Sequence, residues 1–178
     1  MRSWTDNVRK VVPYVPGEQP QGTGIIKLNT NENPYPPAPS VYAIHEKMDI
    51  DRFSLYPDPE AGKLVHGLEH YYNLQGGQVF VGVGSDDVLA LAFLTFFNSG
   101  KPILFPDITY AFYPVWCDLF RIPYERPALD KEFRIVKEDY FRENGGIIFP
   151  NPNAPTGIYM ELSEVEEIIA KNPESIVI

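Results

Sequence analysis

The sequence is poor in cysteine and histidine, on which disulfide-rich and metal-binding proteins depend. It holds one cysteine, Cys117, so no disulfide can form within the chain, and three scattered histidines, His45, His66 and His70. His66 and His70 are four residues apart and fit one helical face, but two ligands without a third do not make a metal site. We therefore expect no metal, and we interpret the histidines as surface or packing residues.

Positive charge and long apolar runs are also scarce. The net charge is −9 and the lysines and arginines form no basic block, which argues against nucleic acid or an anionic membrane as a partner. No apolar stretch approaches the roughly 20 residues of a membrane span, and the first residues show no apolar core of the signal-peptide type. We therefore expect a cytoplasmic protein that binds no nucleic acid and no membrane, with a small molecule as its ligand.

Proline is concentrated near the N-terminus, in residues 12–17 and 29–39. Proline fixes φ and has no N–H group, so neither stretch suits a helix or an inner strand. The apolar residues in this region, among them Tyr14 and Leu28, argue against a disordered tail. We predict an N-terminal arm and part of a small domain over residues 1–50, followed by the first part of a larger ligand-binding domain over residues 51–178.

From about residue 60 onward, short apolar runs alternate with helical stretches. Four runs are near-continuous, as in strands that are buried on both faces: 79–83, 103–105, 147–149 and 176–178. Residues 86–98 and 110–120 are the expected crossover helices, the first of them deeply buried. The alternation predicts an α/β fold, a mostly parallel sheet with helices on both faces.

A third helix is expected after residue 162. Ser163 and Glu166 fit a capping box at its start, and Asn172 and Pro173 mark its end. The chain then stops at Ile178, inside a run with the character of a buried strand. We interpret this as the front part of a longer protein, because a complete domain rarely ends on an uncovered apolar run.

Three loops, each directly after an apolar run, are the candidate binding site: 84–87 (GSDD), 106–110 (PDITY) and 151–157 (NPNAPTG). Open α/β sheets bind ligands at the carboxyl ends of their strands. The first loop opens a helix, so its free N–H groups and the helix dipole suit a phosphate. The alternative is that Ser85 or Asp86 is only a helix cap.

The other two loops supply a ring and amides. Tyr110 begins a helix, where its ring either stacks on a planar ligand or is an ordinary core aromatic. Asn151 and Asn153 carry carboxamides that suit an anionic ring oxygen, although a plain proline-rich connection is the alternative. Together a phosphate cradle, a stacking ring and an amide donor suit a phosphorylated aromatic aldehyde, of which pyridoxal phosphate is the common one.

A dinucleotide is a competing ligand. Gly82, Gly84 and Asp87 partly match the G-x-G-x-x-G fingerprint, and Asp107 stands about 20 residues further on, where an acid meets a ribose hydroxyl. The third glycine is missing, however, and Asp87 would obstruct the close approach of helix and strand that this glycine permits. The fingerprint is therefore the weaker interpretation.

Six segments resemble the fold-type I pyridoxal-phosphate aminotransferases, and within them the enzymes that act on histidinol phosphate. They are Pro13-Tyr14, 28–35 (LNTNENPY), 56–58 (YPD), 84–87, 106–110 and 153–157 (NAPTG). The resemblance covers nearly the whole chain and implies a homodimeric transferase in histidine biosynthesis. It would use pyridoxal 5′-phosphate, a small amino donor, expected to be histidinol phosphate, and a 2-oxo acid, 2-oxoglutarate.

Two alternatives stay open beside this function. One is a lyase or decarboxylase on the same fold, such as threonine-phosphate decarboxylase. The other is a non-catalytic fragment that pairs with a partner chain and presents a binding surface.

The resemblance also assigns roles to individual residues. The implied cofactor-binding residues are Gly84, Ser85, Asp86, Tyr110, Asn153 and Tyr56. Ser85 and Asp86 would offer backbone amides to the phosphate, and Tyr110 would stack on the pyridine ring. Tyr56 would reach the phosphate in the neighbouring subunit, which is why a homodimer is expected.

Two further residues are expected at the substrate, and one position departs from the family pattern. Tyr14, on the arm, would close over the substrate, and Asn33 would also contact it. The residue directly before Pro-Thr-Gly is usually the asparagine that contacts the cofactor ring oxygen, but here it is Ala154. Asn153 or Asn151 would take that role instead.

The resemblance implies that no catalytic residue lies in this chain. In the family the Schiff-base lysine, the aspartate opposite the pyridine nitrogen and the phosphate- and substrate-binding arginines come after the position of Ile178. None of Lys101, Lys131, Lys137 and Lys171 stands in the sequence context of that lysine. Because no amine is available to move the substrate proton, we predict that the chain alone does not catalyse.

Overall fold

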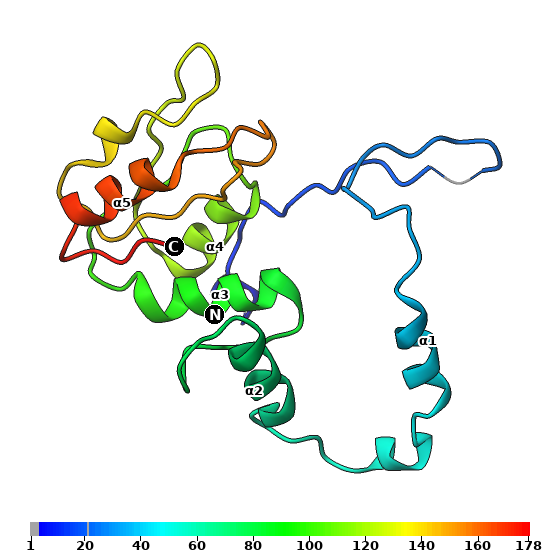
Figure 1. Ribbon diagram of the computed structural model, residues 1–178. Helices are drawn as coiled ribbons and strands as arrows, with labels where there is room; N and C mark the ends of the chain where they lie inside the picture. The colour runs from blue at the N-terminus through cyan, green and yellow to red at the C-terminus, as the bar shows by residue number, and fades with distance from the viewer. Residues whose placement is uncertain (1–3, 21) are drawn as a thin grey trace. The chain divides into compact units, whose positions relative to one another are not determined.

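The computed structural model describes residues 4–20 and 22–178 (Figure 1). By the contacts between their residues, these ranges divide into two units. The first, here called the sheet unit, combines the described residues up to Tyr14 with Gly82–Ile178. The second, here called the helical unit, is Val15–Val81. The domain boundary expected near residue 50 stays a prediction.

The helical unit contains α1 (Pro39–Glu46), η2 (Ile50–Ser54) and α2 (Gly62–Tyr71). Within its described residues no helix or strand precedes α1, as the prolines predicted, and α1 begins at Pro39 because proline suits the first turn of a helix. His66 and His70 lie exposed on α2. Across the described part of the chain, no three His, Cys, Asp or Glu side chains gather as a metal site.

The sheet unit is built on a small parallel sheet. Strands β1 (Ile103–Leu104) and β2 (Tyr124–Glu125) pair in parallel, with Ile103 opposite Tyr124. Single parallel bridges then join Leu104 to Ile147 and Ile147 to Val177. Three of the four expected strand runs therefore lie side by side, and β2 is an addition that the sequence did not predict.

The expected strand at residues 79–83 is wrong. Within the described residues this run pairs with no strand, and its side chains Phe80 and Val83 are exposed. An apolar run becomes a strand only where a neighbour can take up its backbone hydrogen bonds, and none is present here.

Two hydrophobic clusters cover the two faces of the sheet, which confirms the predicted layers. Neighbouring strand residues point to opposite faces, so Ile103 and Ile148 join one cluster while Leu104 and Ile147 join the other. The first cluster includes residues of α3 (Gly84–Phe96) and α4 (Phe112–Phe120), which pack against each other (Figure 1). The second includes residues of η3 (Lys137–Tyr140) and α5 (Leu162–Lys171).

Gly146 allows the third strand run to approach the first cluster closely. Its φ is +137°, and a Cβ atom placed on it would come within 2.4 Å of the Phe97 ring. Any side chain at this position would therefore both strain the backbone and displace a buried aromatic ring.

Two helix predictions need correction. Helix α3 is not deeply buried: Phe93 is its one buried residue, whereas Leu91, Leu94 and Phe96 are 41%, 52% and 52% exposed. One face of α3 packs on the first cluster, and the apolar side chains on its other faces stay partly exposed.

The capping box of α5 also differs. The helix begins at Leu162, and the backbone N–H of Glu161 donates to the Glu164 carboxylate at 3.4 Å, so Ser163 and Glu166 do not form the cap. Glu161 and Glu164, two residues before the expected pair, form the capping box. The end of α5 at Lys171, directly before Asn172, is confirmed.

At the N-terminus of the sheet unit, η1 (Trp4–Asn7) leads into an extended segment. No described helix combines the length and the apolar character that crossing a membrane would require.

Candidate functional site

The first predicted loop forms the start of α3. Gly84 has φ +83°, a backbone conformation that favours glycine, and a Cβ atom there would meet nothing within 4 Å. Ser85 and Asp86 follow in the first turn and are exposed. N–H groups of the first turn lack acceptors within the helix, so both amides lie at the positive end of the helix dipole without a partner carbonyl in α3.

The two carboxylates at this helix start have different partners. Asp87 accepts a hydrogen bond from the backbone N–H of Val83 at 3.1 Å, which ties the loop to the helix. Asp86 accepts a hydrogen bond from the Tyr110 hydroxyl at 2.6 Å. The second contact joins the first predicted loop to the second.

The Tyr110 ring is half-buried against the first hydrophobic cluster. Its centroid lies 5.7 Å from that of Tyr113 and 5.8 Å from that of Phe112. Burial raises the pKa of the Tyr110 hydroxyl, and the hydrogen bond and negative charge of Asp86 raise it further. The hydroxyl therefore stays protonated at neutral pH and donates to Asp86.

The third loop is fastened to the second by Asn153, whose side chain is 2% exposed. Its amide donates to the Ile108 carbonyl at 3.0 Å and to the Thr156 hydroxyl at 3.2 Å, and its oxygen accepts from the Thr109 hydroxyl at 2.9 Å. Both amide hydrogens are thus used within the protein. The contact between Asn153 and a cofactor ring oxygen stays a prediction.

The three loops therefore lie together, linked by Asp86 to Tyr110 and by Thr109 to Asn153. A hollow beside the second and third loops is lined by Thr109, Tyr110, Pro155 and Arg126 among others, and its described lining includes no residue of the first loop. The Arg126 guanidinium donates to the carbonyl of Asp107, and it is the one cationic side chain among the described residues that line this hollow.

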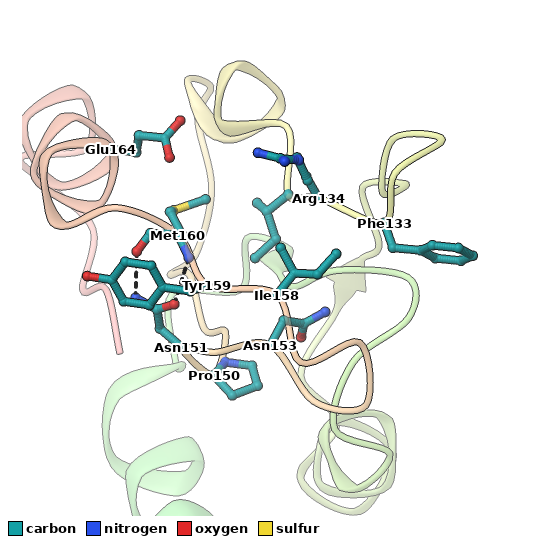
Figure 2. A pocket seen from close by; sticks show the side chains of 10 residues that line it. Phe133, Arg134, Pro150, Asn151, Asn153, Ile158, Tyr159, Met160 and Glu164 are labelled. Carbon is teal, nitrogen blue, oxygen red and sulfur yellow. Dashed lines mark hydrogen bonds between the residues drawn. The ribbon is translucent and has the colours of Figure 1, made fainter.

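A second cavity lies next to the third loop but is separate from the hollow beside Tyr110 (Figure 2). It measures about 50 Å³, and its lining includes Phe133, Arg134 and Glu164 but not Ser85 or Tyr110. Asn151 links the start of the third loop to the residues that follow it. Its side chain donates to the Met160 carbonyl and accepts from the Met160 N–H, both at 2.9 Å. Asn151 is therefore engaged in holding the loop, and its role as a substitute for Ala154 stays a prediction.

The arm reaches the same aromatic group as Tyr110. Arg9 donates to the Leu119 carbonyl on α4, and the Tyr14 ring stacks on Phe112 with centroids 4.5 Å apart. Phe112 in turn contacts Tyr110. Tyr14 is exposed beside the candidate site, where its expected role at the substrate stays a prediction.

The remaining predicted residues belong to the helical unit. Tyr56 is fully exposed in the segment after η2. The Asn33 side chain accepts a hydrogen bond from the Tyr35 N–H at 3.0 Å. Their expected roles at the cofactor and the substrate stay predictions.

Sequence reasoning missed three residues that shape the site. The Thr109 hydroxyl, which contacts Asn153, stands directly before Tyr110, so a polar residue in a predicted binding loop was the available signal. Nothing in the sequence singled out Phe112, which carries the Tyr14 ring, or Arg126, which follows the unpredicted strand β2.

The donor set fits a phosphorylated pyridine cofactor. The amides of Ser85 and Asp86 suit a phosphate, open space lies above Gly84, and the partly exposed Tyr110 ring stands beside them through its contact with Asp86. Positive charge is sparse, because Arg126 alone supplies it among the described residues of the hollow. Neutralising a phosphate dianion here calls for further cationic groups.

Comparison with known proteins identifies the family of the chain. Residues 23–178 match the family model of aminotransferase class I and II. The chain is 52% identical over 176 residues to the histidinol-phosphate aminotransferase of Lactococcus lactis subsp. cremoris (strain MG1363), covering 99% of this chain and 49% of that protein. It is 52% identical over 175 residues to the enzyme of the same name from Pseudomonas syringae pv. syringae (strain B728a), covering 98% and 50%. The chain therefore spans about half the length of the curated relatives that it matches.

Solved structures support the fold. A putative histidinol-phosphate aminotransferase from Erwinia carotovora atroseptica superposes with a TM-score of 0.74 at 19% identity, covering 84% of this chain and 45% of that one. The L-threonine-O-3-phosphate decarboxylase of Porphyromonas gingivalis superposes with a TM-score of 0.61 at 17% identity, covering 78% and 42%. At these identities the likeness concerns the fold alone. From the family match and the identity to its relatives, the chain belongs to the class I and II aminotransferase family.

Proposed function

We propose that these 178 residues form the N-terminal part of a pyridoxal-phosphate-dependent aminotransferase that transfers the amino group of histidinol phosphate to 2-oxoglutarate in histidine biosynthesis. Family membership implies the cofactor. The names of the relatives support the choice of substrate. The observation that carries the proposal is the 2.6 Å contact between Asp86 and Tyr110, which sets the amides of a helix start beside an aromatic ring.

Each residue of the site has a task in this proposal. The amides of Ser85 and Asp86 bind the cofactor phosphate, and the Tyr110 ring lies against the pyridine. Asn153 holds the second and third loops together, and Tyr14 covers the substrate. When bound, the cofactor supplies an electron sink for the bonding electrons released at the substrate carbon.

The residues described here do not supply the base that moves the substrate proton. Lys101 and Lys137 form ion pairs with Glu143 and Glu167 at 2.7 Å and 2.6 Å, and no lysine is among the described residues that line the hollow beside Tyr110. Proton transfer needs a group within hydrogen-bonding reach. The chain alone is therefore proposed to bind the cofactor but not to catalyse amino transfer.

The proposal includes a homodimer and a cytoplasmic location. A fully exposed Tyr56 is available to reach the phosphate site of a second subunit. Sedimentation of the full-length protein would test the dimer, and Tyr56→Phe would test the reach of the hydroxyl through cofactor affinity. Fractionation of cells that express the protein would test its location.

A chimera tests the function directly. The 178 residues would replace the matching N-terminal half of the Lactococcus lactis relative, which supplies the remaining sequence at 52% identity. We expect the chimera to transaminate histidinol phosphate with 2-oxoglutarate, and the same chimera with Tyr110→Ala to retain cofactor poorly. Amino transfer from ordinary amino acids but none from histidinol phosphate would refute the substrate, and decarboxylation of threonine phosphate would favour the alternative reaction.

A further inference from the structure

We propose that Asp86 is a positioning residue, whose side-chain carboxylate sets the orientation of the Tyr110 ring for the cofactor. This inference rests on the proposed function. It assigns to the Asp86 side chain a task that is separate from that of the Asp86 backbone amide.

The packing around Tyr110 does not by itself fix the orientation of its ring. Its ring meets Phe112 at an interplanar angle of 36° and Tyr113 at 79°, and both neighbours belong to or pack against the first cluster. Such aromatic contacts tolerate sliding, because their energy depends weakly on small offsets. The hydroxyl at the far end of the ring is fixed instead by the 2.6 Å hydrogen bond to Asp86. A charged acceptor makes this bond stronger than one between neutral groups.

Helix capping does not account for the Asp86 carboxylate. The neighbouring Asp87 already accepts the N–H of Val83 at 3.1 Å, which is the contact that ties the loop to the helix start. A second carboxylate close to a phosphate site repels the phosphate. The charge of Asp86 therefore opposes cofactor binding, and the task left for this carboxylate is its contact with the Tyr110 hydroxyl.

The two effects of Asp86 have opposite signs, so they can be separated. Removing the charge strengthens phosphate binding, whereas losing the hydrogen bond weakens it by loosening the ring. Asp87→Asn is the matched control, because it removes an equal charge from the same helix turn without touching Tyr110. Tyr110→Phe keeps the ring and removes only the hydroxyl, and Asp86→Asn keeps an oxygen that can accept from it.

The experiment uses the chimera with the Lactococcus lactis relative described above, because the described residues supply little positive charge for a phosphate. The ligand is pyridoxine 5′-phosphate, whose alcohol cannot condense with lysines. Affinity is measured by calorimetry, with pyridoxine as the ligand that lacks phosphate. We expect Asp86→Ala to weaken binding by about 2-fold to 12-fold, because the loss of a charge-assisted hydrogen bond outweighs the relief of repulsion between this carboxylate and the phosphate. Asp86→Asn should restore much of this loss, and Asp87→Asn should leave binding unchanged or tighter. In a Tyr110→Phe background Asp86→Ala should no longer weaken binding.

A second readout needs no cofactor. In protein labelled with carbon-13 at the tyrosine Cζ atom, the Tyr110 resonance is the one lost in Tyr110→Phe, and it should shift in Asp86→Ala but not in Asp87→Asn. Equal binding of pyridoxine and its phosphate by the unsubstituted chimera would refute the proposed phosphate site, and the positioning role with it. Preferential binding of the phosphate with additive losses in Asp86→Ala and Tyr110→Phe, or an unmoved Tyr110 resonance, would refute the positioning role alone.

Discussion

Replacing Asn153 by alanine tests whether this side chain holds the second and third loops together. Asn153 is 2% exposed and makes side-chain hydrogen bonds to Ile108, Thr109 and Thr156. Alanine removes all three bonds and leaves their partners without the acceptor or donor that they face. We therefore expect a loss in the free energy of unfolding of the sheet unit.

The size of this loss follows from the surroundings of the three partners. Three hydrogen bonds at a net value of about 1 kcal/mol each give about 3 kcal/mol. Ile108 is 40% exposed, so water can replace the bond to its carbonyl. This lowers the expected loss to about 2 kcal/mol.

Urea unfolding measures this difference. The chain has two tryptophans, and in a Trp4→Phe background the buried Trp116 reports on the first hydrophobic cluster alone. The matched control is Asn151→Ala, in the same loop, whose side chain is exposed and bonds only to Met160 among the described residues. A loss for Asn153→Ala no greater than that for Asn151→Ala would contradict the reasoning.

Three further predictions concern the backbone, the arm and the buried thiol. Gly146→Ala should lower the free energy of unfolding by more than about 2 kcal/mol, because the new Cβ atom strains a backbone at φ +137° and meets the Phe97 ring at 2.4 Å. The control Gly100→Ala, at φ +76° with open space around the Cβ atom, should cost only the backbone strain of about 1 kcal/mol. Equal urea midpoints for the two variants would contradict this. Tyr14→Ala should release the arm, seen as faster tryptic cleavage after Lys10, and an unchanged rate would mean that the stack does not hold it. Burial raises the pKa of the Cys117 thiol from 9.0 to about 12, so the folded state holds its proton more tightly than the unfolded state. The resulting stability is present below pH 9 and should fall as pH rises from about 9 to 12, in wild type more than in Cys117→Ala, as urea midpoints would show.

Much of the sheet unit could be predicted from the sequence because its strands are covered on both faces. Buried strands leave near-continuous apolar runs, and the runs around Ile103, Ile147 and Val177 all joined the sheet. Strand β2 escaped notice because its residues Tyr124 and Glu125 form no apolar run; the parallel pairing with β1 defines it, and pairing is a property of two segments. For the same reason the apolar run at 79–83 failed as a strand.

The candidate site was predicted in outline but not in its internal connections. Loops after strands, an aromatic residue and amides could be recognised one at a time, and their meeting at one edge followed from parallel topology. The sequence did not indicate that Asn153 donates both amide hydrogens to acceptors within the protein, or that Asp86 rather than Ser85 contacts Tyr110. Such pairings depend on rotamers and on loop paths, which have no periodic signature in a sequence.

The division of adjacent residues between two clusters has a consequence for how this chain can change in length. Ile147 and Ile148 are neighbours, yet each belongs to a different cluster. Deleting or inserting one residue between Gly146 and Ile147 would turn every following side chain of the run to the opposite face. Changes in length are therefore expected to be tolerated in exposed turns such as the one at Glu132, and to be excluded from the few positions of this run.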